Sequence, residues 1–360
     1  MRSLDAIRQK VLNGERLSEQ ESLNLFQEGN LYDLGFLADA IRRKLHPEPV
    51  VTYVIDRNIN YTDICISACK FCAFYKGPED ADGSVISFAE LKKKIEETQE
   101  LRGTQILLQG GLHPDKQLEF YEEMLRFIKV TGIHIHGFSP PEICHFAEIS
   151  GLSVAEVIAR LRKAGLDSIP GGGAEILSDR VRQLVAPRKC SADEWIDVMR
   201  QAHRQGMKTT ATMMFGHVET LEERLEHLLR IRDLQDDTVG FTAFIPWPFQ
   251  PDNTAFADMP KATAHVYLKM LAWSRIVLDN VPNIQASWVT QGPKIAQVSL
   301  FFGANDFGST MIEENVVAAA GVTFRLSEAE IRGLVAEAGF VPQQRTMDYS
   351  FVTTGTNQEH

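Results

Sequence analysis

The spacing of hydrophobic and polar residues changes once along the chain, near residue 50. Before that point the apolar positions recur with a helical period, most clearly over residues 32–45. Ser18 and Glu21 have the spacing of a capping box, which is typical of a helix start. We therefore predict an N-terminal helical extension over residues 1–49.

From residue 50 onward, short β-rich runs alternate with helical stretches such as 87–101 and 191–205. Strands that alternate with helices predict a parallel sheet. Eight such repeats predict an α/β fold in which the sheet closes into a (β/α)8 barrel of the TIM type. The eight predicted strands are residues 51–60, 105–110, 133–138, 167–170, 208–215, 239–246, 284–289 and 297–302.

No Gly/Ser-rich linker, low-complexity block or charge run divides the chain after residue 50. We therefore predict one barrel over residues 50–342, with a last helix at 327–338. A short C-terminal tail is expected over 343–360, and residues 353–360 are expected to be disordered.

Composition excludes several classes of function. The net charge of −11 disfavours a nucleic-acid ligand, because binding to phosphates needs a basic surface. No apolar run approaches the ~20 residues that span a bilayer, and the N-terminus lacks the apolar region of a secretory signal. We therefore expect a cytoplasmic protein with a small-molecule partner, no nucleic acid and no membrane.

Three of the five cysteines, Cys65, Cys69 and Cys72, lie within eight residues of one another after the first predicted strand. Such thiolates can bind an iron–sulfur cluster, but a [4Fe–4S] cube has four irons. Three ligands would leave one iron open to a small molecule, as catalytic metal sites keep an open position. A structural zinc site is the alternative, although it would need a fourth ligand nearby. Cys144 and Cys190 are expected to be packing residues.

Ligands of such barrels bind at the C-terminal ends of the strands, where this sequence is rich in glycine. After the second strand, Gly110 and Gly111 would let backbone carbonyls approach a cofactor ammonium group; a plain tight turn is the alternative. After the fourth strand, Gly172 and Gly173 suggest a close approach of the backbone to a ligand. Glu175 follows them and could accept hydrogen bonds from ribose hydroxyls.

The last strand ends offer further candidates. Gly216 would allow an adenine ring to lie against the backbone after the fifth strand. Asn305 and Asp306 follow the predicted eighth strand. A carboxylate at the barrel mouth could accept a proton, whereas a helix N-cap would explain either residue equally well.

These motifs resemble a known family. The segment Cys65-x-x-x-Cys69-x-Phe-Cys72 is similar to the signature of the radical S-adenosylmethionine (SAM) superfamily. Within that superfamily, the chain resembles the dehypoxanthine futalosine cyclases of the futalosine route to menaquinone, through Arg57-Asn-Ile-Asn-Tyr, Pro170-Gly-Gly-Gly-Ala-Glu and Gly303-Ala-Asn-Asp. Aminofutalosine synthases and deazaflavin (FO) synthases share the last two motifs and stay open as alternatives, as does a non-enzymatic electron carrier.

The resemblance implies two cofactors, a [4Fe–4S] cluster and SAM, and an external one-electron donor such as flavodoxin or ferredoxin. It implies a 5′-deoxyadenosyl radical that takes the hydrogen from ribose C4′ of dehypoxanthine futalosine, after which the carbon radical closes a ring on the benzoate. The candidate base is His217 or Asp306. Arg57 is the candidate for the benzoate carboxylate, Asn305 is a further substrate contact, and Phe71 is a cofactor contact.

Overall fold

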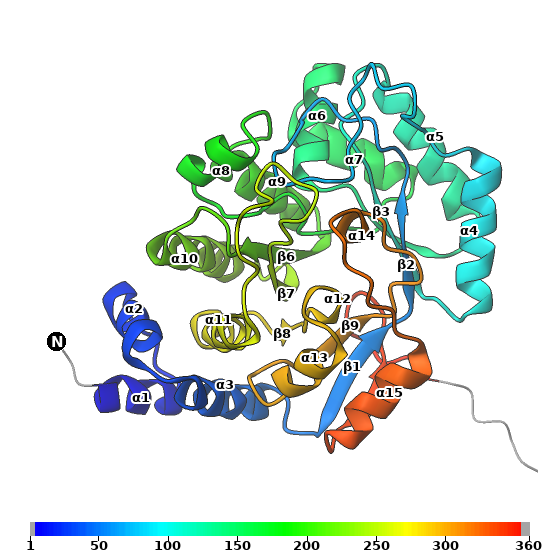
Figure 1. Cartoon of the computed structure of the whole chain (residues 1–360). Coiled ribbons are helices and arrows are strands. Elements are labelled where there is room, and N and C mark those ends of the chain that lie inside the picture. Colours follow the sequence, from blue (N-terminus) through cyan, green and yellow to red (C-terminus); the bar gives the residue numbers. More distant parts are fainter. Residues whose placement is uncertain (1–3, 354–360) are drawn as a thin grey trace, which may run out of the picture.

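The computed structural model describes residues 4–353 of the 360-residue chain, and Figure 1 shows the arrangement of its elements. The expected disorder at 353–360 falls almost entirely outside the described residues. The strands are β1 (Val50–Val54), β2 (Asp56–Asn60), β3 (Gln105–Gln109), β4 (His134–Gly137), β5 (Ser168–Ile169), β6 (Lys208–Phe215), β7 (Phe241–Pro248), β8 (Asn283–Ile284), β9 (Asp306–Ser309) and β10 (Val341–Gln344).

The strands form a closed parallel barrel. Strands β2 to β8 pair in sequential order as one seven-stranded sheet. β1 and β2 are two halves of one bent run separated by Ile55, and β1 pairs with β9 while β2 pairs with β3. A bridge between Gln285 and Asp306 joins the end of β8 to β9 and completes the ring. The predicted (β/α)8 barrel is thus confirmed.

The last two predicted strands were partly wrong. The seventh is extended only at Asn283–Ile284, and the helix α12 (Trp288–Gln291) follows it. The predicted eighth strand, 297–302, overlaps the helix α13 (Pro293–Ser299). Pro293 at the start of α13 has the fixed φ that favours a first helical turn, and this outweighs the β-branched residues that follow. The eighth barrel strand is β9 instead.

The helices cover the outside of the barrel (Figure 1). Their bounds are α1 (Leu4–Asn13), α2 (Glu19–Glu28), α3 (Leu31–Leu45), α4 (Phe88–Glu100), α5 (Leu118–Lys129), α6 (Pro140–Ser150), α7 (Val154–Ala164), α8 (Asp179–Val185), α9 (Ala192–Arg204), α10 (Leu221–Thr238), α11 (Ala264–Val277), α14 (Val316–Ala319) and α15 (Glu328–Glu337).

Local capping signals explain many of the helix starts. The predicted capping box of Ser18 and Glu21 is present at α2. The same Ser/Thr-x-x-Glu pattern caps α7, α9, α10 and α15, satisfying amide groups that would otherwise lack partners. The helix α6, which we did not predict, begins at Ser139-Pro-Pro-Glu142 with the same signal and with proline at its first position.

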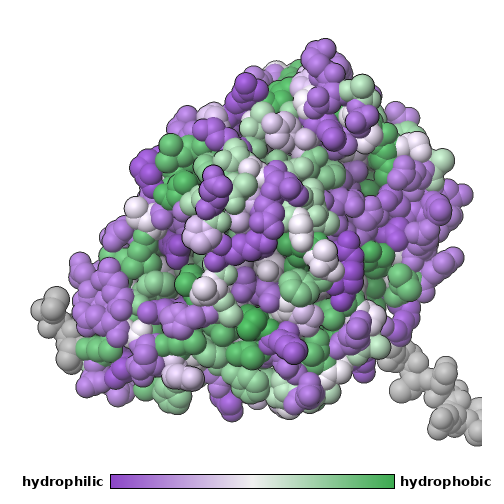
Figure 2. Space-filling model, viewed as in Figure 1, coloured by the Kyte–Doolittle hydropathy of each residue, from purple (hydrophilic) through white to green (hydrophobic). Residues whose placement is uncertain are grey.

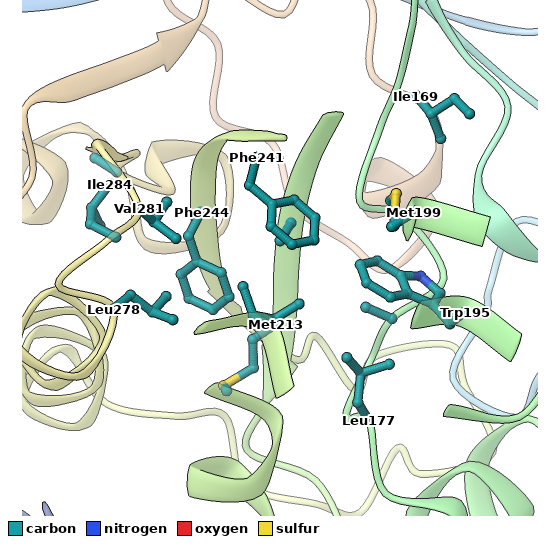
Figure 3. Close-up of a cluster of buried hydrophobic side chains, with 14 of the residues drawn as sticks. Ile169, Leu177, Trp195, Met199, Met213, Phe241, Phe244, Leu278, Val281 and Ile284 are labelled. Atoms are coloured by element: carbon teal, nitrogen blue, oxygen red, sulfur yellow. The ribbon is translucent and has the colours of Figure 1, made fainter. Parts of the chain in front are cut away.

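The main core lies between the barrel and the helices around it. In Figure 3 the side chain of Phe241 on β7 points toward Trp195 on α9, and their ring centroids are 6.5 Å apart. On the other side of β7, Phe244 lies beside Leu278 in the same cluster. On the face seen in Figure 2, hydrophobic residues are scattered among hydrophilic ones. No helix within residues 4–353 is long and apolar enough to cross a membrane.

The segment after β10 (residues 345–353, here the C-terminal segment) covers the N-terminal end of the barrel. β10 pairs with the outer edge of β1, so the proposed boundary at residue 342 falls inside this strand; the division into domains stays a prediction. Arg345 then donates two hydrogen bonds to Asp306 at the start of β9. The guanidinium of Arg345 lies 4.0 Å from the ring centroid of Tyr349. The C-terminal segment thereby places its side chains at the base of the barrel interior.

Candidate active site

A cavity of about 300 Å³ occupies the barrel interior. Its lining comes from inward-facing residues of most barrel strands, from the glycine segment 171–173 and from the C-terminal segment. Alternation along β2 places Asp56 and Asn58 in the cavity and turns Arg57 outward. The cavity is therefore closed at one end by the C-terminal segment and bordered at the other by the glycine segment.

The loop that follows β2 (residues 61–87, here the cysteine loop) carries Cys65, Cys69 and Cys72, all as free thiols. Short antiparallel and parallel bridges at Thr62 and Ile64 hold the loop together. The amide of Cys72 also donates to the carbonyl of Cys69 at 3.1 Å. The three sulfurs are thus presented by one folded loop.

Gly110 and Gly111 form the surface on which the cysteine loop docks. A Cβ atom at Gly111 would lie 2.2 Å from the carbonyl oxygen of Ile64, and one at Gly110 would lie 2.6 Å from the ring of Tyr61. The next amide, that of Leu112, donates to the sulfur of Cys65 at 3.3 Å. The glycines therefore serve close packing against the loop, and their contact with a cofactor ammonium group stays a prediction.

The thiols of Cys69 and Cys72 lie in surroundings that favour their neutral form. Burial raises the pKa of the Cys69 thiol to about 11, and a hydroxyl contact from Ser67 at 3.2 Å partly opposes it. Burial also raises the pKa of Cys72. Cluster binding would displace these protons, since metals bind the thiolate.

The residues present fit an iron–sulfur cluster. Three free thiols from one loop, with an amide hydrogen bond to one sulfur, are the donor set and the tuning contact such clusters use. Within the described part of the chain, no three His, Cys, Asp or Glu side chains converge as ligands of a single metal ion. A [4Fe–4S] cube does not require the three sulfurs to converge on one point, because each thiolate binds a separate iron.

Glu175 lies in the cavity wall after the glycine segment, with only 6% of its surface exposed. Its Oε1 atom accepts from the ammonium of Lys189 at 2.8 Å, and Arg182 lies 3.5 Å from Oε2. Oε2 has no hydrogen-bond partner. The backbone at Glu175 has φ of 41°, which holds the carboxylate in a strained turn. A buried acceptor without a hydrogen bond, in a residue that lines the cavity, is a candidate partner for a ligand hydroxyl.

Lys189 connects this carboxylate to the cysteine loop. Its ammonium lies 5.0 Å from the ring centroid of Phe71, between two of the cysteines. Burial alone would lower the pKa of Lys189, but the charge of Glu175, together with that of Cys69 when it is a thiolate, outweighs burial and raises it. The ammonium group is therefore cationic at neutral pH and lies at the boundary between the cysteine loop and the cavity.

Gly172 and Gly173 also lie in the cavity wall, as predicted for a close approach of a ligand. A Cβ at Gly172 would lie 2.4 Å from the side-chain nitrogen of Gln109. Gly173 has φ of 71°, and a Cβ there would lie 2.4 Å from Pro141. Side chains at these positions would displace neighbouring residues at the cavity rim.

Gly216 and His217 follow β6 and lie outside the cavity lining. Gly216 has φ of 91°, and the nearest atom to a Cβ there would be 3.4 Å away. The Nε2 atom of His217 lies 2.9 Å from the Met214 carbonyl, and Nδ1 lies 3.1 Å from the carboxylate of Glu219. Nε2 is thus engaged, whereas Nδ1 lies near Glu219 without a hydrogen bond, and burial lowers the pKa of His217. The base role of His217 stays a prediction, and its position outside the cavity lining does not favour it.

The remaining three candidates are held in structural contacts. Arg57 points to α4, where it pairs with Glu97 at 2.7 Å. Asn305 accepts from Arg275 at 2.7 Å and from the amide of Ile284 at 3.0 Å. Asp306 begins β9 and therefore lies at the opposite end of the barrel from the expected mouth, because the eighth strand starts there rather than ending before it. Substrate or base roles for the three stay predictions, and these placements argue against them.

Sequence reasoning missed several residues that face the cavity. Asn58 presents a side-chain oxygen without a partner, and His136 and Gln105 also contribute to the lining. Alternation along the strands could have identified them, since they share a face with other inward residues. Lys189 lies in a connection between helices, and no pattern in its surroundings indicates its contacts.

The comparisons with known proteins agree with this geometry. The model of the radical SAM superfamily matches residues 59–231, and the model of the CofH/MqnC C-terminal region matches residues 238–358. The barrel, the cysteine loop and these matches define a radical SAM enzyme.

Two relatives of known name indicate the family to which the chain belongs within the radical SAM superfamily. The chain is 47% identical to a cyclic dehypoxanthine futalosine synthase of Halalkalibacterium halodurans, over 99% of this chain and 97% of the relative. It is 44% identical to a 5-amino-6-(D-ribitylamino)uracil–L-tyrosine 4-hydroxyphenyl transferase of Archaeoglobus fulgidus, over 90% and 94%. The chain belongs to the CofH/MqnC family of the radical SAM superfamily.

Solved structures share the fold at low sequence identity. The FeFe-hydrogenase maturase HydG from Carboxydothermus hydrogenoformans superposes with a TM-score of 0.76 and 19% identity, covering 96% of this chain and 80% of that chain. Methylornithine synthase (PylB) superposes with a TM-score of 0.72 and 17% identity, covering 93% and 97%. These structures confirm the barrel architecture.

Proposed function

We propose that this enzyme converts dehypoxanthine futalosine to cyclic dehypoxanthine futalosine in menaquinone biosynthesis. The observation that carries the proposal is the 47% identity, over nearly the whole of both chains, to a relative named cyclic dehypoxanthine futalosine synthase. A second relative of that name, from Streptomyces coelicolor, is 46% identical over 96% of this chain and 88% of the relative.

Membership of the superfamily implies a [4Fe–4S] cluster and SAM. Cys65, Cys69 and Cys72 would hold the cluster, and Glu175 would accept a hydrogen bond from the SAM ribose. When bound, these groups supply a 5′-deoxyadenosyl radical, with the electron coming from an external donor such as flavodoxin or ferredoxin.

The protein's own contribution is to enclose and orient the substrate. The reaction would begin with removal of the hydrogen at ribose C4′ and continue with closure of the new carbon radical onto the substrate's benzoate ring. Both steps depend on held geometry, since the hydrogen must face the radical and the ring must then face C4′. A cavity of about 300 Å³ inside a barrel limits access of water and of other hydrogen donors.

A second candidate is the transferase activity named for the archaeal relatives, because the relative from Archaeoglobus fulgidus is 44% identical over 90% of this chain. A direct test separates the two. The anaerobically reconstituted enzyme is incubated with reductant, SAM and dehypoxanthine futalosine deuterated at C4′.

We expect deuterium in 5′-deoxyadenosine, about one per turnover, and a product two hydrogens lighter than the unlabelled substrate. Turnover of L-tyrosine with 5-amino-6-(D-ribitylamino)uracil, and none of the futalosine, would support the transferase and overturn the proposal. Unlabelled 5′-deoxyadenosine beside a cyclised product would mean that the hydrogen comes from another position.

A further inference from the structure

A chain of hydrogen bonds runs from the cavity through β4 and β5, and we refer to it as the histidine chain. His136 on β4 lines the cavity, and its Nδ1 atom lies 2.7 Å from the hydroxyl oxygen of Ser168 on β5. The same hydroxyl lies 2.7 Å from Nε2 of His134, two residues earlier on β4. His134 and His136 share the inward face of the strand, and Ser168 stands opposite His136 in the sheet register.

The histidine chain leads from a buried residue of the cavity wall to a partly exposed one. His136 is 6% exposed and Ser168 is 1% exposed, whereas His134 is only partly buried. Burial lowers the pKa of His136 well below its ordinary value, and His134 and Arg345 add to the effect. Burial also lowers the pKa of His134, which faces Asp167, Lys129 and Asp348. At neutral pH the two imidazoles are therefore uncharged.

Two opposite arrangements of protons satisfy the whole chain, and one of them suits a relay out of the cavity. Ser168 has a single hydroxyl proton, so it donates to one imidazole and accepts from the other. If Nδ1 of His136 carries its proton, it donates to Ser168, and Ser168 donates to Nε2 of His134. Nε2 of His136 is then an acceptor whose one hydrogen-bond partner is the hydroxyl of Thr210, at the long distance of 3.5 Å.

The carboxylates that line the cavity are less available as proton acceptors than His136, because each is held by hydrogen bonds. Asp56 accepts from Gln105 at one oxygen and from Ser309 at the other. Glu314 accepts from the backbone amides of residues 316–318. Glu175 is paired with Lys189. His136 alone among these groups combines an acceptor held only by a long hydrogen bond, that to Thr210, with a hydrogen-bonded route out of the cavity.

We propose that His136 accepts the proton lost from the benzoate ring after cyclisation, and that Ser168 and His134 relay it toward the N-terminal end of the barrel. This inference rests on the proposed function, in which ring closure leaves a cyclohexadienyl radical. The ring carbon–hydrogen bond breaks, its electron pair restores aromaticity, and the proton goes to Nε2 of His136. The Nδ1 proton passes to Ser168 and the hydroxyl proton passes to His134. The surplus electron of the ring leaves to a one-electron acceptor of the iron–sulfur class.

The test uses Ser168→Ala and His136→Gln in the reconstituted full-length enzyme. Both variants should still form deuterium-labelled 5′-deoxyadenosine from the C4′-labelled substrate, within about twofold of the wild-type rate. Cyclised product should fall roughly 100-fold, because a positioned proton acceptor contributes about 10²–10⁴-fold. His203→Gln is the matched control, since His203 is also buried between two hydroxyls, those of Thr209 and Thr238, but lies outside the cavity lining.

Two outcomes would overturn the relay. One is an equal loss of 5′-deoxyadenosine and product in Ser168→Ala, which would indicate a general disturbance of the site. The other concerns which ring nitrogen of His136 carries the proton. Nitrogen-15 NMR of the histidine rings measures this without any substrate, and His136→Gln assigns the signals. A proton on Nε2 of His136 rather than on Nδ1 contradicts the relay even if the enzyme proves to act on another substrate.

Discussion

The carboxylate of Glu175 has one oxygen hydrogen-bonded to Lys189, whereas the second lies 3.5 Å from Arg182 and accepts no hydrogen bond. A buried carboxylate is costly unless both oxygens are satisfied, so the second oxygen is poised for a ligand. The sequence predicted this residue because it follows three glycines at a strand end. It did not predict Lys189, since the contact joins two loops of the β5–β6 connection that lie on either side of α8.

Replacing Glu175 with glutamine keeps the shape and removes the charge. A hydrogen bond to a charged group contributes about 1.5–3 kcal/mol, so weakening it should reduce SAM affinity about tenfold. Titration of SAM into the reconstituted variant measures the effect, and the iron content should not change. Glu223→Gln is the control, because Glu223 is also paired with an arginine, Arg180, but lies outside the cavity lining. Unchanged SAM affinity with a lowered melting temperature would make Glu175 a purely structural residue.

Other single-residue predictions depended on where a strand begins and ends. Arg57 was placed on the correct strand, but it follows Asp56, and alternation turns it to the outer face. The same alternation would have assigned Asn58 to the interior. Residue types at strand ends therefore indicated where the site lies, while the face of each strand decided which of them reach the cavity.

The cysteine loop can pack closely against the chain beside it because that chain has glycine, without a side chain, at residues 110 and 111. The amide of Ile66 donates to the carbonyl of Leu112 at 2.9 Å, and Gly111 lies directly against Ile64. The cysteine spacing was readable from the sequence, but this docking surface was not. Gly110 and Gly111 were predicted to contact a cofactor, whereas their observed neighbours are Tyr61 and the loop itself.

Gly111→Ala should displace the cysteine loop, because the new Cβ would lie 2.2 Å from a backbone oxygen that cannot rotate away. We expect reconstituted iron to fall by at least half, as measured by iron analysis and by the charge-transfer absorbance of the cluster. Gly333→Ala in α15 is the control, since no atom lies within 4 Å of a Cβ there. That control should keep its iron and gain about 0.5–1 kcal/mol of stability. Full iron content in Gly111→Ala would show that the loop binds its cluster independently of this contact.

For the barrel as a whole, strand alternation predicted the architecture, and the error came at the closing strand. A strand of four residues, Asp306–Ser309, carries too little hydrophobic pattern to compete with the apolar run at 297–302. Closure itself depends on the pairing of β1 with β9 and on an ion pair between Arg345 and Asp306. Such contacts join distant parts of the chain, so no pattern in the neighbouring sequence predicts them.

Arg345→Met should strongly destabilise the fold, since it leaves Asp306 buried without its partner. Breaking a buried pair on one side costs about 3–5 kcal/mol. Urea unfolding of the cluster-free protein measures the loss, and adding Asp306→Asn should recover part of it. Arg180→Met breaks a more exposed pair and should cost no more than about 1 kcal/mol. A similar small loss for Arg345→Met would contradict a structural role for the buried pair.

The outer edge of β1 stays uncovered during most of the synthesis of the chain, because β10, its partner, is made much later. β1 is among the first strands synthesised, and β10, which covers its edge, is the last. At roughly 5–20 residues per second, the ~290 residues between them take on the order of 15–60 s to emerge. During that time the edge that carries Val51 and Tyr53 is open to pairing with other chains. Slow translation late in the message would prolong this exposure, so yield should depend on how soon the C-terminal segment is completed.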